Sequence, residues 1–261
     1  MGLWNGPGYS DGITLQKFYS ADNTSEYIYQ NSTKGEFKFD GIDDYIDLPD
    51  GFANFTGGLT FGVWAYPTDS NKNWARFIEL ANGSNNNNIL FARNGTSNDL
   101  TFEVYNGTET GGRVTAAGAI ELNKWQYFAA TMDNAGNVKI YKNGVLLTTT
   151  ETKTAVPQNV TRVNNYIGKS NWIQDGYYQG NIAEVQIYNR ELCAAEINSN
   201  KTGNISINCL VLEHNYRSNT AEDISLNGNN GTIYGGVTFN VISTTTETGT
   251  YDPANRIWVK K

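Results

Sequence analysis

The chain has little of what nucleic-acid binding, membrane insertion or histidine-based catalysis requires. It carries 19 basic against 26 acidic residues, a net charge of −7, which argues against nucleic acid as a partner because such binding needs Lys and Arg to neutralise phosphates. No apolar run approaches eighteen residues, so we expect no transmembrane helix and no membrane insertion. The first twelve residues show neither a basic region nor an apolar stretch, so no signal peptide is visible.

Catalytic patterns are also missing. His214 is the single histidine, and no Gly-x-Ser-x-Gly elbow accompanies it, so a nucleophile with an adjacent base is not expected. Concanavalin A-like glucanases carry their carboxylates as Glu-x-Asp-x-x-Glu or a shorter variant on one strand, and no such string occurs here. We therefore predict that the chain is not an enzyme.

Cysteine is scarce as well. The chain has only Cys193 and Cys209, sixteen residues apart. A disulfide closing such a loop would contribute about 3 kcal/mol. We expect this Cys193–Cys209 disulfide, with two unpaired thiols as the open alternative.

Aromatic residues and glycine are abundant instead. Aromatics make up 13% of the chain, and 27 residues are Gly. Short runs of alternating apolar and polar residues are broken by turn signals every eight to twelve positions, a spacing typical of a sandwich or jelly roll. Only "RELCAAEINSN", residues 190–200, reads as a helix. The predicted fold class is all-β, a two-sheet antiparallel jelly-roll sandwich.

Several phrases resemble one known family in both order and spacing. They are "FKFDGIDDYIDLP", "LTFGVWAYPT", "NKWQYFAATMDNAGNVKIYKNGVLL", "YIGKS" and "GNIAEVQIYNRELCAAEI". Over Gly35 to Asn198 the chain is similar to the LamG-like (laminin-G type) jelly roll of the concanavalin A-like lectin/glucanase superfamily, found in bacterial and phage surface proteins. The resemblance implies a concanavalin A-like sandwich whose members mostly bind carbohydrate or protein, and few of which are catalytic alone.

The order of the chain departs from that family. The family's opening phrase stands near the C-terminus, as "LVLEHNYRSNTAEDISLNGNNGTIYGGVTF", whereas residues 2–9 retain only a fragment of it. We therefore divide the chain into a jelly roll at residues 1–207 and a segment at residues 208–261 that resembles the opening strands. A circular permutation, in which this segment completes the same sandwich, is favoured because termini lie close together in compact domains. A tandem array and strand addition to a neighbouring subunit are the alternatives.

A cluster of aspartates suggests a structural calcium ion. Asp40, Asp43 and Asp44 crowd one bend, and Ca²⁺ takes six to eight oxygen ligands that often include carboxylates. The resemblance implies an ion near this segment, with Glu184 approaching from the last strand. There the family usually has an acidic pair, and this chain has Ala183-Glu184. Alternatively, Asp40-Gly41 only makes the turn and the other carboxylates are solvated.

Polar loops supply candidate carbohydrate ligands. Sugar rings stack on exposed aromatic faces beside amides and carboxylates that bind hydroxyls. The candidates share loop positions between strand phrases, and they are Asn73, Trp74, Trp172, Asp175, Tyr177 and Tyr178. Alternatively, these aromatic residues cap the ends of the sandwich.

These features together predict a non-catalytic recognition or adhesion module on a cell or particle surface. Its expected partner is a glycan or a surface protein, and its expected location is extracellular, on the cell surface or on a virion. The alternative is a structural component of a virion fibre, a capsid decoration or a surface polymer. Its partners would then be neighbouring subunits or further copies of the chain.

Overall fold

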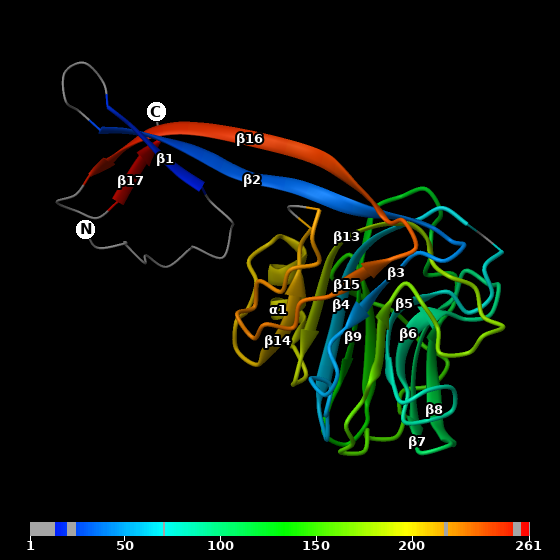
Figure 1. Cartoon of the computed structure of the whole chain (residues 1–261). Helices are drawn as coiled ribbons and strands as arrows, with labels where there is room; N and C mark the ends of the chain where they lie inside the picture. Colours follow the sequence, from blue (N-terminus) through cyan, green and yellow to red (C-terminus); the bar gives the residue numbers. More distant parts are fainter. Residues whose placement is uncertain (1–13, 20–24, 70, 217–218, 253–256, 261) are drawn as a thin grey trace.

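A computed structural model describes residues 14–19, 25–69, 71–216, 219–252 and 257–260, and side chains within 35–241. Two antiparallel sheets pack face to face (Figure 1). This arrangement confirms the predicted all-β, two-sheet antiparallel sandwich. The described part has one helix, α1 (Ala194–Lys201), which overlaps the predicted stretch and ends one residue beyond it. No described helix has the length and apolar character needed to cross a membrane.

The larger sheet has ten described strands. Its main path runs β11 (Val145–Leu146), β10 (Val138–Lys142), β9 (Gln126–Met132), β4 (Leu59–Pro67), β13 (Gln179–Tyr188), β2 (Ser25–Asp40), β16 (Thr238–Asp252) and β17 (Ile257–Lys260). Beside this path, β1 (Thr14–Tyr19) pairs with β2, and β14 (Leu210–His214) pairs with β13.

The second sheet has seven described strands. Their order is β15 (Thr232–Tyr234), β3 (Tyr45–Leu48), β12 (Asn164–Ile167), β5 (Arg76–Ala81), β6 (Ile89–Arg93), β7 (Leu100–Asn106) and β8 (Glu109–Ala116). β3 shows the alternation expected of a strand with one buried face, since Ile46 and Leu48 are buried while Tyr45 and Asp47 are partly exposed.

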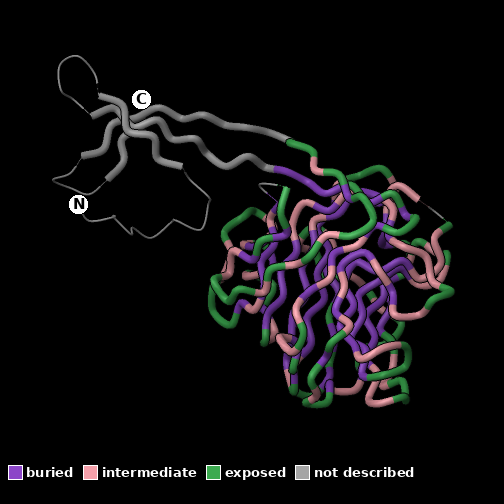
Figure 2. The backbone as a smooth tube through the Cα atoms, viewed as in Figure 1, coloured by how far each residue is buried: buried purple, intermediate pink, exposed green. Residues whose placement is uncertain are grey.

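The core lies between the two sheets, where the buried residues, purple in Figure 2, are concentrated. Phe61 of β4 faces Phe102 of β7 with ring centroids 5.9 Å apart, and Phe77 of β5 lies 5.5 Å from Phe128 of β9. Each such ring contributes roughly 1.5–3 kcal/mol by leaving water. These cross-sheet contacts bury one face of the second sheet and leave its other face outside the core.

The C-terminal segment contributes strands to both sheets. β14 pairs with β13, with His214 opposite Val185, and β15 pairs with β3. The first residues of β16 pair with β2, with Phe239 opposite Phe37. Residues 210–241 therefore contribute strands to the sandwich formed by the preceding chain.

Beyond the sandwich, β2 and β16 continue together as a two-stranded ribbon that leads away from it (Figure 1). Their pairing extends to Thr250 opposite Glu26. β1 and β17 pair with the outer parts of β2 and β16. This ribbon has no counterpart among the sequence expectations.

The two cysteines do not form the expected disulfide in this structure. Both are free and exposed. Cys193 is the N-cap of α1, and its side chain accepts from the backbone of the first helical turn. Cys209 has φ 59°, and its sulfur contacts Asn208 Oδ1 at 3.5 Å. The sulfurs thus point into separate local contacts.

Candidate functional site

The outer face of the seven-stranded sheet carries a row of mostly polar side chains. Neighbouring strands bring these residues opposite one another in the order Asp47, Tyr166, Glu79, Leu90, Glu103 and Arg113. Directly opposed residues on adjacent strands share one face of a sheet. The row therefore collects residues from β3, β12, β5, β6, β7 and β8 on the face turned away from the core.

A pocket of about 170 Å³ lies at the β5–β8 end of this row. Its lining combines aromatic, basic and acidic side chains, namely Trp74, Arg76, Leu90, Glu103, Tyr105, Arg113, Trp172, Gln174 and Asp175. The sheet supplies the floor, and two loops, one before β5 and one before β13, supply the two tryptophans. Concave sites with a few convergent polar groups are the usual form of a ligand pocket.

Arg76 holds the two tryptophan loops together. Its side chain is 2% exposed; its Nε donates to Glu79 Oε2 at 2.6 Å and its Nη2 donates to Asp175 Oδ2 at 2.9 Å. Its Nη1 donates to the carbonyl of Trp74. One guanidinium therefore ties the Trp74 loop to the Trp172 loop, and charge-assisted hydrogen bonds of this kind are among the strongest in proteins.

The Trp172 loop is fixed by further hydrogen bonds. Ser170 Oγ donates to Asp175 Oδ2 at 2.8 Å, and Asn171 Nδ2 donates to Glu79 Oε1 at 3.1 Å. Burial raises the pKa of Asp175, although Arg76 and Ser170 oppose that shift. These contacts present the Trp172 ring in one orientation, 5.5 Å from the ring of Tyr105.

A second arginine stands over the other tryptophan. Arg113 Nε contacts Glu103 Oε2 at 3.0 Å, and its Nη2 contacts Oε1 at 3.3 Å. Its guanidinium carbon lies 4.4 Å from the centroid of Trp74, within cation–π range. The pocket thus joins two aromatic rings to two paired arginines.

The structure brings together Trp74, Trp172 and Asp175 at the pocket. Asn73 lies beside them, with its Nδ2 3.5 Å from Asp175 Oδ1. Tyr177 is outside the pocket and lies 6.3 Å from the ring of Tyr45. Carbohydrate binding by these residues stays a prediction. The residues that lie at or beside the pocket are all at one end of the second sheet.

Tyr178 is in the core. Its side chain is 3% exposed and lies between Phe39 and Phe77, at centroid distances of 5.8 Å and 5.3 Å. Burial raises its pKa well above the usual value. A buried ring has no free face on which a sugar could stack, so the prediction that Tyr178 binds carbohydrate is wrong.

Sequence reasoning missed several residues of the pocket, among them Arg76, Glu103, Tyr105 and Arg113. Outward alternation along "LTFEVYNG" could have marked Glu103 and Tyr105. Arg76 and Arg113 come from β5 and β8, which are separated by β6 and β7. Their positions on the sheet depend on the strand register, which local sequence does not specify.

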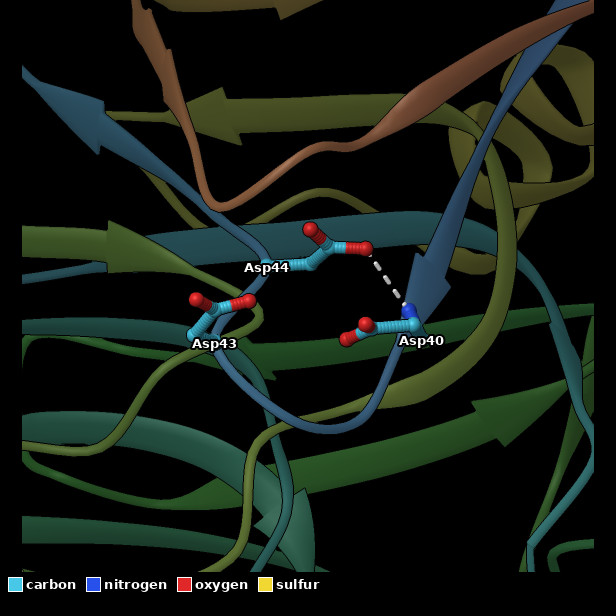
Figure 3. A group of neighbouring side chains, drawn as sticks. All are labelled: Asp40, Asp43 and Asp44. Carbon is cyan, nitrogen blue, oxygen red and sulfur yellow. Dashed lines mark hydrogen bonds between the residues drawn. The ribbon is translucent and has the colours of Figure 1, made fainter.

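The aspartate bend lies at the opposite part of the second sheet, between β2 and β3 (Figure 3). One carboxylate oxygen each of Asp40, Asp43 and Asp44 lies within 4.8 Å of the others. Asp44 Oδ2 accepts from the Asp40 backbone N–H at 2.8 Å, and Asp40 Oδ1 accepts from Ile42 N at 2.7 Å. Gly41, at φ 77°, makes the turn that the alternative interpretation expected.

Asp44 is the residue of this bend that fits an oxygen-liganded ion. It is 3% exposed, and its Oδ1 has no hydrogen-bond partner among the described residues. Burial raises its pKa, with the charges of Asp40 and Asp43 adding to the shift. A buried carboxylate of this kind is costly without a compensating charge, which a cation would supply.

Glu184 does not join the aspartates. Gln179 of β13 is opposite Asp40, whereas Glu184 stands five residues further along and opposite Trp64. Five strand residues correspond to roughly 16 Å. Glu184 instead accepts a hydrogen bond from Gln186. The expected contribution of the last strand to the aspartate bend is therefore not seen.

Comparison with known proteins identifies the family. The profile of the concanavalin A-like lectin/glucanases superfamily matches residues 40–198, more than half of the chain. The chain belongs to this superfamily. No curated protein sequence matches the chain.

Solved structures share the fold at low sequence identity. A proposed carbohydrate-binding protein from Bacteroides ovatus has a TM-score of 0.60 and 15% identity, over 82% of this chain and 61% of its own. The heptameric SAP-like pentraxin of Limulus polyphemus has a TM-score of 0.53 and 16% identity, over 80% and 95%. CBM40 of the Ruminococcus gnavus IT-sialidase has a TM-score of 0.49 and 15% identity, over 66% and 100%. The chain thus spans about three fifths of the Bacteroides protein, and the first two similarities show the fold alone.

Proposed function

We propose that this chain is a non-catalytic carbohydrate-binding module that binds sugar in the Trp74–Trp172 pocket. The observation that carries the proposal is the convergence of two loop tryptophans and Tyr105 with paired arginines and carboxylates in one pocket. Aromatic rings supply apolar contact for the faces of a sugar ring. The side chains of Arg113, Gln174 and Asp175 supply donors and acceptors for its hydroxyls.

The size of the pocket suits a small ligand unit. Its volume of about 170 Å³ is below the roughly 300–1,000 Å³ of pockets that take drug-sized ligands. One ring of a glycan, rather than several rings side by side, is the unit that we expect it to hold. The similarity to the Bacteroides ovatus protein, itself proposed to bind carbohydrate, supports the same ligand class.

Engaged carboxylates favour binding over hydrolysis. Glycosidases need one carboxyl group that donates a proton and a second that acts as base or nucleophile. In the pocket, Glu103 is paired with Arg113 and Asp175 with Arg76. A carboxylate that already accepts hydrogen bonds from a guanidinium is less available to act on a glycosidic bond.

A glycan array probed with the full chain tests the proposal. We expect a restricted set of glycans to be retained, because the pocket presents fixed donors and two fixed rings. If no glycan is retained at micromolar protein concentration, the carbohydrate assignment is wrong. Exposed glycans occur on surfaces, so the proposed location is extracellular or at the surface of a cell or particle.

A structural calcium ion is part of the proposal. Asp40, Asp43 and Asp44 would hold it, and its charge would offset the buried Asp44 carboxylate. When bound, the ion would fix the bend between β2 and β3, at the opposite end of the second sheet from the pocket. We assign it no part in sugar chemistry.

One observation favours a second candidate function, assembly with neighbouring subunits. The β2–β16 ribbon continues beyond the sandwich and carries β1 and β17 (Figure 1). The outer edges of such a sheet offer backbone groups for strand addition. A structural component of a virion or surface polymer could use the ribbon in this way.

A further inference from the structure

Arg113 already uses the edge of its guanidinium that would bind an acidic ligand. Its Nε and Nη2 face the two oxygens of Glu103 at 3.0 Å and 3.3 Å. This two-point arrangement is the geometry by which arginine recognises a carboxylate. A uronate or sialate carboxylate entering the pocket would find the edge formed by Nε and Nη2 already occupied by Glu103.

Glu103 is held firmly in this position. Its side chain is 3% exposed, while that of Arg113 is 40% exposed. Thr110 Oγ1 also donates to Glu103 Oε1, at 3.1 Å. Displacement by a ligand would leave a buried carboxylate without its counter-charge, which is strongly unfavourable.

Arg76 offers no spare charge either. It contacts Glu79 and Asp175, and it is 2% exposed. The charged groups lining the pocket are two arginines, Arg76 and Arg113, and two carboxylates, Glu103 and Asp175. With Glu79 directly behind Arg76, the pocket presents no excess of positive charge to an anion.

Given the proposed carbohydrate function, on which this step rests, we infer that the pocket selects uncharged sugar rings and that Glu103 is the residue that excludes acidic ones. Glu103 acts in two ways: it occupies the arginine edge, and its own charge repels a second carboxylate. Such a repulsive element is a common source of specificity. Neutral hydroxyls need no guanidinium edge, and Gln174 lines the pocket with an uncharged amide.

The test compares neutral glycans with their sialylated or uronic-acid counterparts on one array, using the full chain and the E103Q variant. The wild type is expected to retain neutral members and to bind acidic counterparts at least about tenfold more weakly. E103Q keeps the size of the side chain but frees the charge of Arg113, so affinity for acidic counterparts should rise about tenfold and fall again with added salt.

Two further variants make the result specific. E191Q removes a carboxylate from the exposed pair with Lys139 of β10, on the other sheet, and should leave the neutral–acidic ratio unchanged. The double variant E103Q/R113Q should lose the gain, because the freed cation is then absent. Thermal melting of each variant confirms that it is folded.

Each outcome decides between the claims. Preference of the wild type for acidic glycans overturns the inference while the carbohydrate function stands. An unchanged ratio in folded E103Q overturns the role of Glu103. Failure of every form to bind any glycan overturns both the proposed function and the inference.

Discussion

His214 is fully buried in β14, where it is the chain's single histidine. Its Nε2 donates to the Asn229 carbonyl at 3.2 Å, and its Nδ1 has no partner among the described residues. Burial lowers its pKa to about 4, although Asn229 and the charge of Asp223 oppose the shift. The histidine therefore holds C-terminal residues against the sandwich in its neutral form.

This burial predicts an acid-sensitive fold. Because the unfolded chain binds the proton more readily, with a pKa near 6.5, the stability from His214 is complete above that pH and is lost as pH falls toward 4. The loss should approach roughly 3 kcal/mol. Urea unfolding at a series of pH values between 7 and 4 measures this loss of unfolding free energy. A plot of the unfolding free energy against pH should be less steep for H214Q than for the wild type. If the unfolding free energy depends on pH equally in the wild type and in H214Q, the burial of a neutral His214 is contradicted.

At the scale of single residues, loop context pointed to side chains that the fold brings together, and their binding of sugar stays a prediction. Trp74, Trp172 and Asp175 were predicted from polar loop context, and the structure places all three at the pocket. Tyr177 and Tyr178 were treated alike, although successive residues of an extended chain point to opposite sides. One of them enters the core, and the sequence offered no means of choosing which.

Among the elements, strand alternation could be predicted from sequence, whereas strand register could not. The phrase "LTFGVWAYPT" contains β4, and the predicted helical stretch covers all of α1 except its last residue. Arg76, Glu103 and Arg113 meet through pairings between β5, β6, β7 and β8. Register depends on packing and turn geometry across distant segments. The row of side chains on the outer face of the second sheet therefore could not be predicted from the sequence.

The bend between β2 and β3 carries the calcium prediction. If the ion binds with a dissociation constant near 0.1 mM, a hundredfold excess should stabilise the fold by about 2.7 kcal/mol. Thermal melting with and without 10 mM CaCl₂ measures this as a rise of several degrees. The shift should vanish in D44N and persist in D50N, which removes an exposed carboxylate nearby. An equal melting temperature of the wild type with and without Ca²⁺ would contradict the proposed calcium site.

At the scale of the whole molecule, the sandwich was predictable and the ribbon was not. Phrase order and alternation indicated a jelly roll, and the two sheets confirm it. Ribbon formation depends on pairing between segments more than 200 residues apart, such as Thr246 with Gln30. Long-range pairing of this kind carries little local signal. Circular permutation remains a hypothesis about how the C-terminal strands came to lie in this sandwich.

The ribbon gives the assembly candidate its own test. If assembly requires the ribbon, light scattering should find oligomers of the full chain and monomers of T246P, because proline removes a backbone donor from the β2–β16 ladder. T246S is the matched control and should remain oligomeric. A wild-type chain that is monomeric at all concentrations would contradict the assembly candidate.

The proposed function depends on sugar binding at the Trp74–Trp172 pocket. Isothermal titration with the best glycan from the array tests it most directly, with W172A compared with the wild type. W125A is the control, since Trp125 packs on Tyr66 away from the pocket, with centroids 5.6 Å apart. We predict that W172A loses at least about tenfold in affinity, since one stacking contact contributes roughly 1–3 kcal/mol, and that W125A stays within about twofold. Unchanged affinity in folded W172A would contradict the assignment of this pocket as the binding site.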